Sequence, residues 1–228
     1  MENIDHIKEL LNRFIPVQVR VQENNKNETP YYNVFKVLRI EYLEARVHTP
    51  FLADLLNPRG LHSQGQIFLD SFLKLVSPEK KWTEYEKENI EIKTEHKTSQ
   101  GVIDILIFHR NQIKQKRFLI IIENKIFACD QENQIERYYN YALKDLKIPK
   151  EQILLVYLKP TRDSPTEFSI SGKLKNELDK NGLLKLLGYS PDISAMLLEC
   201  NESINSQKLK QTIIQYIDIL KEFNYGEE

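Results

Sequence analysis

The stretch Arg117-Phe-Leu-Ile-Ile-Ile-Glu123-Asn-Lys125-Ile126 is an apolar run that ends in a carboxylate and an ammonium group two positions apart. Its length and composition predict a buried β-strand. Because residues i and i+2 of a strand point to the same face, Glu123 and Lys125 should lie side by side. Charged groups so close to an apolar strand need a partner or a function. The pair is therefore either an ion pair that caps a core strand or one part of a functional site.

A second apolar segment lies just upstream, Gly101-Val-Ile-Asp104-Ile-Leu-Ile-Phe108, and it holds one acid among apolar residues. The connection between the two segments is short and polar, which predicts an antiparallel hairpin. In the simplest register the side chains of Asp104, Glu123 and Lys125 converge, whereas a slip of one residue would separate them. The register therefore decides whether these three residues form a site.

The chemistry of such a cluster follows from its charges. Two carboxylates that face one another repel unless a cation or a shared proton lies between them. Hard oxygen ligands of this kind suit Mg²⁺ or Mn²⁺, and Lys125 would add a positive charge beside the metal. A metal that activates water next to a fixed cation fits the hydrolysis of phosphate esters. Glu95, late in the preceding strand, either joins the acidic cluster or faces solvent.

The remaining sequence predicts helices before and after the strands. Thr49-Pro50 is typical of a helix start and opens a short helix that ends at Leu56. Apolar residues at helical spacing predict the other helices, over about 3–15, 31–48, 64–76, 130–146, 173–187 and 206–223. Strands are predicted over 89–97, 101–109, 117–126 and 152–158. The order of strand, helix and strand at the end of this series favours parallel pairing of the last two strands.

The composition indicates one globular domain. A chain of 228 residues with 41% hydrophobic and 29% charged residues can bury a sizeable core. A net charge of −1 excludes a strong overall attraction to nucleic acid, so any such attraction must come from a local patch. The two cysteines lack metal-ligand spacing, and the apolar content of the chain leads us to expect neither a signal segment nor a membrane-spanning segment. We therefore expect a cytoplasmic protein with no membrane partner.

Asp104, followed at the end of the next strand by Glu123-Asn-Lys125, resembles the PD-(D/E)XK nuclease superfamily. The core of that superfamily runs helix, three strands, helix, strand, which is the order predicted above. The proline that gives the superfamily its name is absent, since Val102-Ile103 precede Asp104. Further motifs are similar to an uncharacterised bacterial family of this superfamily, and they span roughly residues 33–220: Glu44-Ala-Arg-Val-His48-Thr-Pro, Asn57-Pro-Arg-Gly60, His62, Gly65, Phe68-Leu69, Asp130-Gln131, Gln134, Arg137-Tyr138 and Gln215-Tyr216-Ile217.

The resemblance implies roles for particular residues. Asp104 and Glu123 would bind the metal together with the main-chain carbonyl of Asn124, and Lys125 would be the catalytic lysine. Glu44 corresponds to an acid of the first core helix that completes the metal site. The remaining candidates are substrate-binding residues: Gln134 and Tyr138, which resemble the Gln-x-x-x-Tyr element of RecB-like nucleases, and Gln131.

These observations predict an α/β protein with a restriction-endonuclease-like core over about 33–160 and a helical extension over about 161–228, in one domain of residues 1–228. The expected activity is hydrolysis of phosphodiester bonds in DNA with Mg²⁺ or Mn²⁺. Two alternatives stay open: a nucleic-acid-binding or regulatory module with this fold and little turnover, and a nuclease that acts on RNA. The sequence also leaves the oligomeric state open, a homodimer included.

Overall fold

The computed structural model describes residues 31–77, 89–109 and 118–223, together with the isolated positions 17, 23, 26 and 29. Its centre is a five-stranded sheet in the order β1-β2-β3-β4-β5. The β1–β2 and β2–β3 pairs are antiparallel, and the β3–β4 and β4–β5 pairs are parallel. The strands are β1 (Ile90–Thr98), β2 (Gly101–His109), β3 (Phe118–Asn124), β4 (Ile153–Lys159) and β5 (Leu184–Gly188). The predicted hairpin and the predicted parallel pairing are both confirmed.

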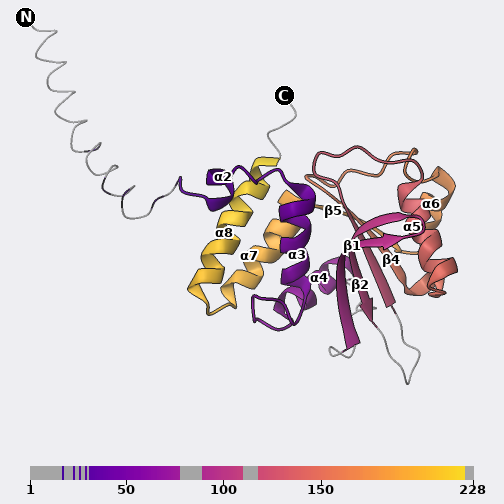
Figure 1. The fold of residues 1–228 in the computed structure, drawn as a ribbon, viewed down its shortest axis with the longest axis horizontal. Helices are drawn as coiled ribbons and strands as arrows, with labels where there is room; N and C mark the ends of the chain where they lie inside the picture. The colour runs from indigo at the N-terminus through magenta and orange to yellow at the C-terminus, as the bar shows by residue number, and fades with distance from the viewer. Residues whose placement is uncertain are drawn as a thin grey trace, which may run out of the picture.

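Helices cover both faces of the sheet, so the fold has three layers (Figure 1). One face is covered by α5 (Gln134–Asn140) and α6 (Gly172–Lys180). The other is covered by helices from the two ends of the described chain: α2 (Val34–Val37), α3 (Thr49–Leu56), α4 (Ile67–Val76), α7 (Ser194–Glu202) and α8 (Gln207–Glu222). None of the helices in the described ranges combines the length and apolar character that a membrane span requires.

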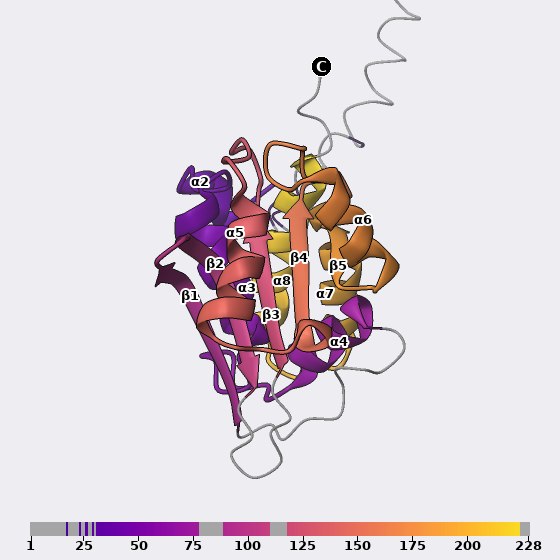
Figure 2. The ribbon, with the colours of Figure 1, turned by 90° about the vertical axis from the view of Figure 1, so that its right-hand side faces the viewer.

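The central strand β3 has apolar residues on both faces because each face packs against a different helix layer. Ile120 and Ile122 belong to the core on the α3 side, whereas Leu119 and Ile121 belong to the core on the α5 side. All seven residues of β3 are buried. A continuous apolar run is the expected sequence of a strand covered on both faces. The strands β3 and β4 end at the upper edge of the sheet in Figure 2, where the loops that follow them lie.

The predicted helix over 31–48 is wrong in its middle. The chain forms α2, turns, and then forms the π-helical turn η1 (Glu44–His48). The turn includes Arg39 in a left-handed conformation with φ of 55°, which a continuous helix does not permit. The predicted short helix from Thr49-Pro50 to Leu56 is confirmed as α3. Thr49 is not its N-cap, because η1 runs directly into α3 and Thr49 has helical backbone angles. Gln215 of α8 holds α2 in place, since its side chain accepts a hydrogen bond from the Val34 nitrogen at 2.7 Å.

The predicted helix over 173–187 is also wrong in its second half. Helix α6 ends at Lys180, and Gly182 follows with φ of 65°, a conformation that favours glycine. Residues from Leu184 then pair with β4 as the fifth strand. The predicted helix over 130–146 begins later, at Gln134, and its last turn is the π-helical η3 (Tyr141–Asp145). The predicted helices over 64–76 and 206–223 are present as α4 and α8, and the one over 3–15 lies outside the described residues.

Candidate active site

The register of the β2–β3 hairpin brings Asp104 to Glu123. Leu106 pairs with Ile121 and Ile105 with Ile122, so the next position along the ladder sets Asp104 opposite Glu123. The Asn124 main-chain nitrogen donates a hydrogen bond to Asp104 Oδ2 at 2.7 Å, which fixes the carboxylate at the end of β3. The two acids therefore lie at the same end of the sheet, where β3 ends and a loop begins.

Glu123 is the centre of a buried polar network. Its Oε1 atom accepts hydrogen bonds from Lys125 Nζ at 2.9 Å and from Gln134 Nε2 at 2.6 Å. Gln134 Nε2 also lies 3.1 Å from the hydroxyl of Tyr138, which donates to the Val102 carbonyl at 2.6 Å. Only 1% of Glu123 and 4% of Lys125 is exposed, so this ion pair lies in the protein interior.

The second carboxylate oxygen of Glu123 lies outside this hydrogen-bond network. Glu123 Oε2 is buried and has no hydrogen-bond partner among the described residues. An unsatisfied carboxylate oxygen in the interior is costly, and a carboxylate accepts only hydrogen bonds or cations. The position therefore suits a cation.

The helix layer contributes Glu44 from the opposite side of the strand end. Glu44 lies in η1, and its Oε2 atom accepts a hydrogen bond from the main-chain nitrogen of Ile126 at 2.6 Å. The side chain of Asn124 points toward the same layer, because its Nδ2 atom donates to Thr49 Oγ1 at 3.0 Å. Helix α5 and helix α3 thus hold the two sides of the same strand terminus.

Burial makes the ionised forms of the two acids in the cluster less favourable than in water. Burial raises the pKa of Glu123 to about 8, and the neighbouring Asp104 carboxylate adds to this effect. Burial likewise raises the pKa of Asp104 to about 6, although the Asn124 N–H opposes the shift. Burial alone would lower the pKa of Lys125, but the carboxylates of Glu123, Asp104 and Glu44 raise it instead. Lys125 is therefore a charged ammonium group beside acids that repel one another.

These residues fit a hard divalent cation by their chemistry, although they are not yet assembled as ligands. In residues 31–77, 89–109 and 118–223, no group of three or more His, Cys, Asp or Glu side chains is close enough to hold a metal ion. Asp104 Oδ2 and Glu44 Oε2 instead accept main-chain hydrogen bonds. A cation would satisfy the free oxygen of Glu123 and offset the repulsion between the acids, and its binding would require some of these side chains to rotate.

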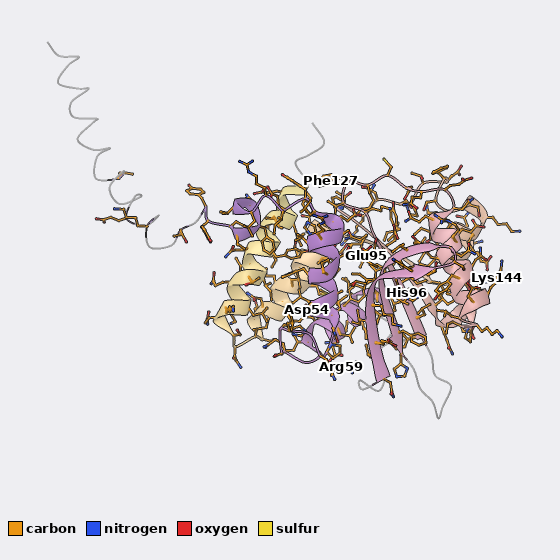
Figure 3. All side chains as sticks on the ribbon, in the orientation of Figure 1. Asp54, Arg59, Glu95, His96, Phe127 and Lys144 are labelled. Atoms are coloured by element: carbon orange, nitrogen blue, oxygen red, sulfur yellow. The ribbon has the colours of Figure 1, made fainter. Side chains whose placement is uncertain are left out.

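The other candidate residues lie at increasing distance from this centre. Gln131 is exposed; its nitrogen lies 3.4 Å from Gln134 Oε1, and its side-chain oxygen accepts from Arg137. Glu95 is exposed on β1 (Figure 3). Its charge nevertheless adds to the effect of burial in raising the pKa of Asp104. His48 is buried, with its ring nitrogens bonded to the Tyr216 hydroxyl and the Glu41 carbonyl, so its position is structural.

Two features of this region were not predicted from the sequence. Asp130 connects the loop after β3 to the loop after β4, because its oxygens accept hydrogen bonds from Tyr157 Oη at 2.6 Å and from both Thr166 N and Thr166 Oγ1. The aromatic rings of Tyr42 and Phe127 lie 5.5 Å apart on the surface. The Asp130-Gln131 motif was a signal for the first feature, whereas no pattern in the sequence pairs Tyr42 with Phe127.

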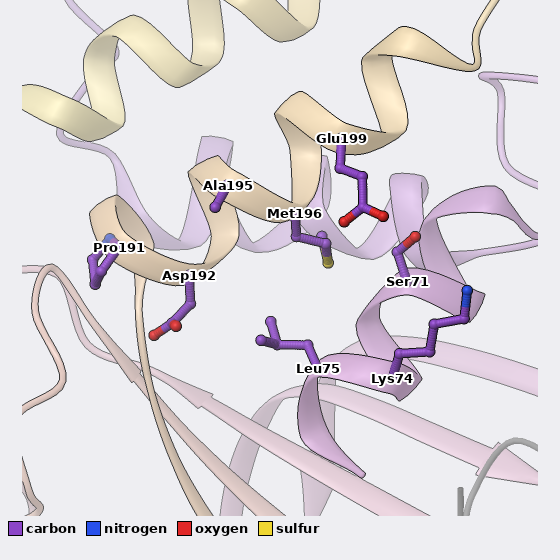
Figure 4. A pocket seen from close by; sticks show the side chains of 8 residues that line it. All are labelled: Ser71, Lys74, Leu75, Pro191, Asp192, Ala195, Met196 and Glu199. Atoms are coloured by element: carbon purple, nitrogen blue, oxygen red, sulfur yellow. The ribbon is translucent and has the colours of Figure 1, made fainter. Parts of the chain in front are cut away.

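A hollow of about 330 Å³ lies elsewhere, between α4 and the π-helical turn η5 (Tyr189–Ile193) with α7 (Figure 4). Its walls carry both apolar and charged side chains, among them Leu75, Met196, Lys74 and Glu199. None of the residues of the acidic cluster lines it. The candidate active site is therefore distinct from this hollow.

A family model described as the PD-(D/E)XK nuclease superfamily matches residues 32–218. The chain belongs to this superfamily. The mixed sheet flanked by helices is consistent with the restriction-endonuclease-like fold of its members. No curated protein and no solved structure matches the chain. Membership in the PD-(D/E)XK superfamily indicates a nuclease that binds nucleic acid, and nucleases of this superfamily generally use divalent metal ions.

Proposed function

We propose that this PD-(D/E)XK protein hydrolyses phosphodiester bonds in DNA with Mg²⁺ or Mn²⁺ held at the acidic cluster. The observation that carries the proposal is the position of Asp104 opposite Glu123, whose Oε2 atom is buried without a partner. A purely structural ion pair between Glu123 and Lys125 would need neither a second acid nor a free oxygen. Burial raises the pKa of both acids, and repulsion from Asp104 and Glu44 raises that of Glu123 further, so a cation there would stabilise the ionised carboxylates.

In this proposal the residues of the cluster have different roles. Asp104, Glu123 and the main-chain carbonyl of Asn124 hold the metal, and Glu44 completes the site from the helix layer. When bound, the metal supplies a Lewis acid that polarises the phosphate and lowers the pKa of water. Lys125 keeps its positive charge through its acidic neighbours, and this charge stabilises the phosphate oxygens as negative charge develops.

Gln134 and Tyr138 act at the border of the site. Gln134 Nε2 fixes the orientation of the Glu123 carboxylate, and the Tyr138 hydroxyl fixes Gln134 in turn. Gln131 is exposed in the loop three residues before Gln134, where it can contact the substrate beside the metal. The similarity of Gln134 and Tyr138 to the Gln-x-x-x-Tyr element of RecB-like nucleases remains a prediction.

The test is cleavage of DNA by the purified full chain. We expect conversion of supercoiled plasmid and shortening of linear DNA in Mg²⁺ or Mn²⁺, with no reaction in EDTA. Asp104→Asn should abolish the reaction because it removes a ligand charge without changing the shape of the side chain. Asp179→Asn, the same change at an exposed position of α6, is the matched control and should cleave as the wild type does.

Three results would contradict parts of the proposal. Equal cleavage by Asp104→Asn and Asp179→Asn would exclude the site. Cleavage of RNA but not DNA would correct the substrate. Tight binding of nucleic acid without cleavage in any divalent metal would identify a binding module in place of an enzyme.

A further inference from the structure

Two large aromatic side chains are exposed next to the candidate active site. Tyr42 is 56% exposed and Phe127 is 58% exposed, and their ring centroids lie 5.5 Å apart in an edge-to-face arrangement. Contiguous exposed aromatic surface is unusual on a soluble domain and marks an interaction site more often than a single exposed residue does. The Tyr42–Phe127 pair is therefore a candidate interaction surface.

The pair is anchored in the core and is not a loose surface feature. Phe223 at the end of α8 is 5% exposed and lies beneath both rings, 5.8 Å from Phe127 and 6.5 Å from Tyr42. Phe223 in turn packs against the buried ring of His48 at 5.3 Å. Rings fixed by such contacts lose little conformational freedom on binding, which favours them as a preformed surface.

The pair is also joined to the acidic cluster through the backbone. Phe127 follows Ile126, whose nitrogen is bound by Glu44, and Tyr42 precedes Glu44 by two residues. Lys125 precedes Phe127 by the same spacing, so the Cα atoms of each such pair lie no more than about 7 Å apart. Figure 3 shows Phe127 at the upper edge of the molecule, the edge at which β3 ends, and Arg59 at the opposite edge.

We infer that the Tyr42–Phe127 pair is a stacking surface for an unpaired nucleobase beside the phosphodiester bond at the acidic cluster. The inference rests on the proposed function and names its substrate class: nucleic acid with single-stranded nucleotides at the cleavage position. Both faces of a base inside a duplex are covered by its neighbours, so an external ring can stack only on an unpaired, terminal or extruded base. Stacking on aromatic rings tolerates any sequence, because every base has a π-face.

A protein partner fits this surface less well. Phe127 follows Lys125 by two residues, so a partner seated on the rings would lie beside the candidate active site, to which a protein brings no phosphate. A nucleic-acid strand instead offers a base to the rings and a phosphate to the site, which satisfies both kinds of group.

The test uses the full chain in EDTA, so that binding is measured without cleavage. The probe is a short single-stranded oligodeoxynucleotide with one 2-aminopurine, whose fluorescence falls when it stacks, and the same strand in a blunt duplex. We expect wild-type protein to quench the single strand and to bind it more tightly than the duplex. Phe127→Leu keeps apolar bulk but removes the π-face, so it should weaken single-strand binding about ten-fold with duplex binding unchanged.

Two further variants separate stacking from general packing. Phe127→Trp should retain the quenching, because it restores an aromatic face. Phe168→Leu is the matched control, since Phe168 is also 58% exposed but lies on the loop before α6, and it should behave as the wild type. The unfolding curve of each variant is compared with that of the wild type, so that a loss of folded structure is not mistaken for a loss of binding.

The outcomes distinguish this inference from the proposed function. Equal single-strand binding by Phe127→Leu and wild type, or no quenching in the wild type, would overturn the stacking surface. A change of oligomeric state in Phe127→Leu, seen by sedimentation, would also overturn it and identify a contact between copies of the chain. Loss of quenching in Phe127→Leu supports it even if no variant cleaves DNA, a result that would contradict the nuclease proposal alone.

Discussion

Glu44 Oε2 accepts a hydrogen bond of 2.6 Å from the main-chain nitrogen of Ile126. The bond joins the π-helical turn before α3 to the residue that follows the Glu123-Asn-Lys125 motif. A single carboxylate therefore connects the helix layer to the strand end and brings its negative charge to the acidic cluster, where it raises the pKa of both Asp104 and Glu123. The cluster is complete only when the helix layer is docked on the sheet.

Replacing Glu44 separates its charge from its hydrogen bond. Glu44→Gln keeps an oxygen that can accept from Ile126, so we expect a loss of unfolding free energy of no more than about 1 kcal/mol. The same change removes a negative charge from the cluster and should weaken Mn²⁺ binding at least ten-fold. Urea unfolding and titration with Mn²⁺ followed by calorimetry measure the two effects.

A matched control for this variant is Glu132→Gln, the same change at an exposed position before α5. It should alter neither stability nor Mn²⁺ affinity. Wild-type Mn²⁺ affinity in Glu44→Gln would show that Glu44 is a structural acceptor alone.

The stability of the metal-free protein should fall as the pH rises from 6.5 to 8. The folded pKa of Glu123 is raised to about 8 from an unfolded value near 4.5, so within this window the folded state binds more protons than the unfolded state. Below pH 6.5 the lowered pKa of His48, about 4, gives a slope of the opposite sign, and Asp104 also titrates there. Both contributions decline above pH 6.5, so Glu123 dominates the slope toward pH 8.

Urea unfolding at pH 6.5 and pH 8 checks this expectation, and Glu123→Gln, which cannot titrate, should flatten the dependence. Added Mg²⁺ should raise the unfolding free energy more at pH 8 than at pH 6.5, because only the ionised carboxylate binds the cation. A wild-type stability that rises with pH across the window would contradict the raised pKa of Glu123.

The sequence was sufficient to predict four of the five strands and the candidate residues of the cluster, because apolar runs and the hairpin connection are local signals. The sequence left the register of β2 and β3 open, and the register of the structure sets Asp104 opposite Glu123. Membership in the superfamily supports the same fold. Local chemistry was therefore enough wherever the neighbours of a residue are close in the chain.

The remaining features depend on contacts between distant segments. The segment from Leu184 to Gly188 has no strong strand pattern and becomes β5 because the edge of β4 is open to it. The predicted helix over 31–48 is broken by a turn, and Gln215 from α8 binds the short helix α2 that precedes this turn. The Tyr42–Phe127 pair likewise forms only over Phe223 from the last helix. No periodicity within one segment can reveal such partners.

The Tyr138 hydroxyl should contribute to stability and to the orientation of Gln134. It donates to the Val102 carbonyl at 2.6 Å and accepts from Gln134, and it is almost fully buried. Tyr138→Phe leaves the carbonyl without this donor, so we expect a loss of about 1–2 kcal/mol in unfolding free energy. If DNA is cleaved, kcat should fall several-fold because Glu123 loses part of its fixed environment.

The comparison variant is Tyr139→Phe, the same change at the neighbouring position. The Tyr139 hydroxyl is buried and has no hydrogen-bond partner among the described residues, so its removal should leave stability and kcat nearly unchanged. Equal effects of the two substitutions would show that the hydrogen bonds of Tyr138 carry no special weight.

Asp130 should hold the loop after β3 in place by accepting three hydrogen bonds, from Tyr157 Oη, Thr166 N and Thr166 Oγ1. These bonds lower its pKa although burial opposes the shift, so they favour the ionised carboxylate. In Asp130→Asn, the NH2 group of the amide faces at least one hydrogen-bond donor and cannot accept from it. We expect a loss of about 2 kcal/mol in unfolding free energy. Tyr157→Phe and Thr166→Val each remove one donor and should cost less.

In a double-mutant cycle, Asp130→Asn with Tyr157→Phe should show a coupling energy of about 1 kcal/mol. Additive effects would mean that the two loops are held together by packing and not by this carboxylate.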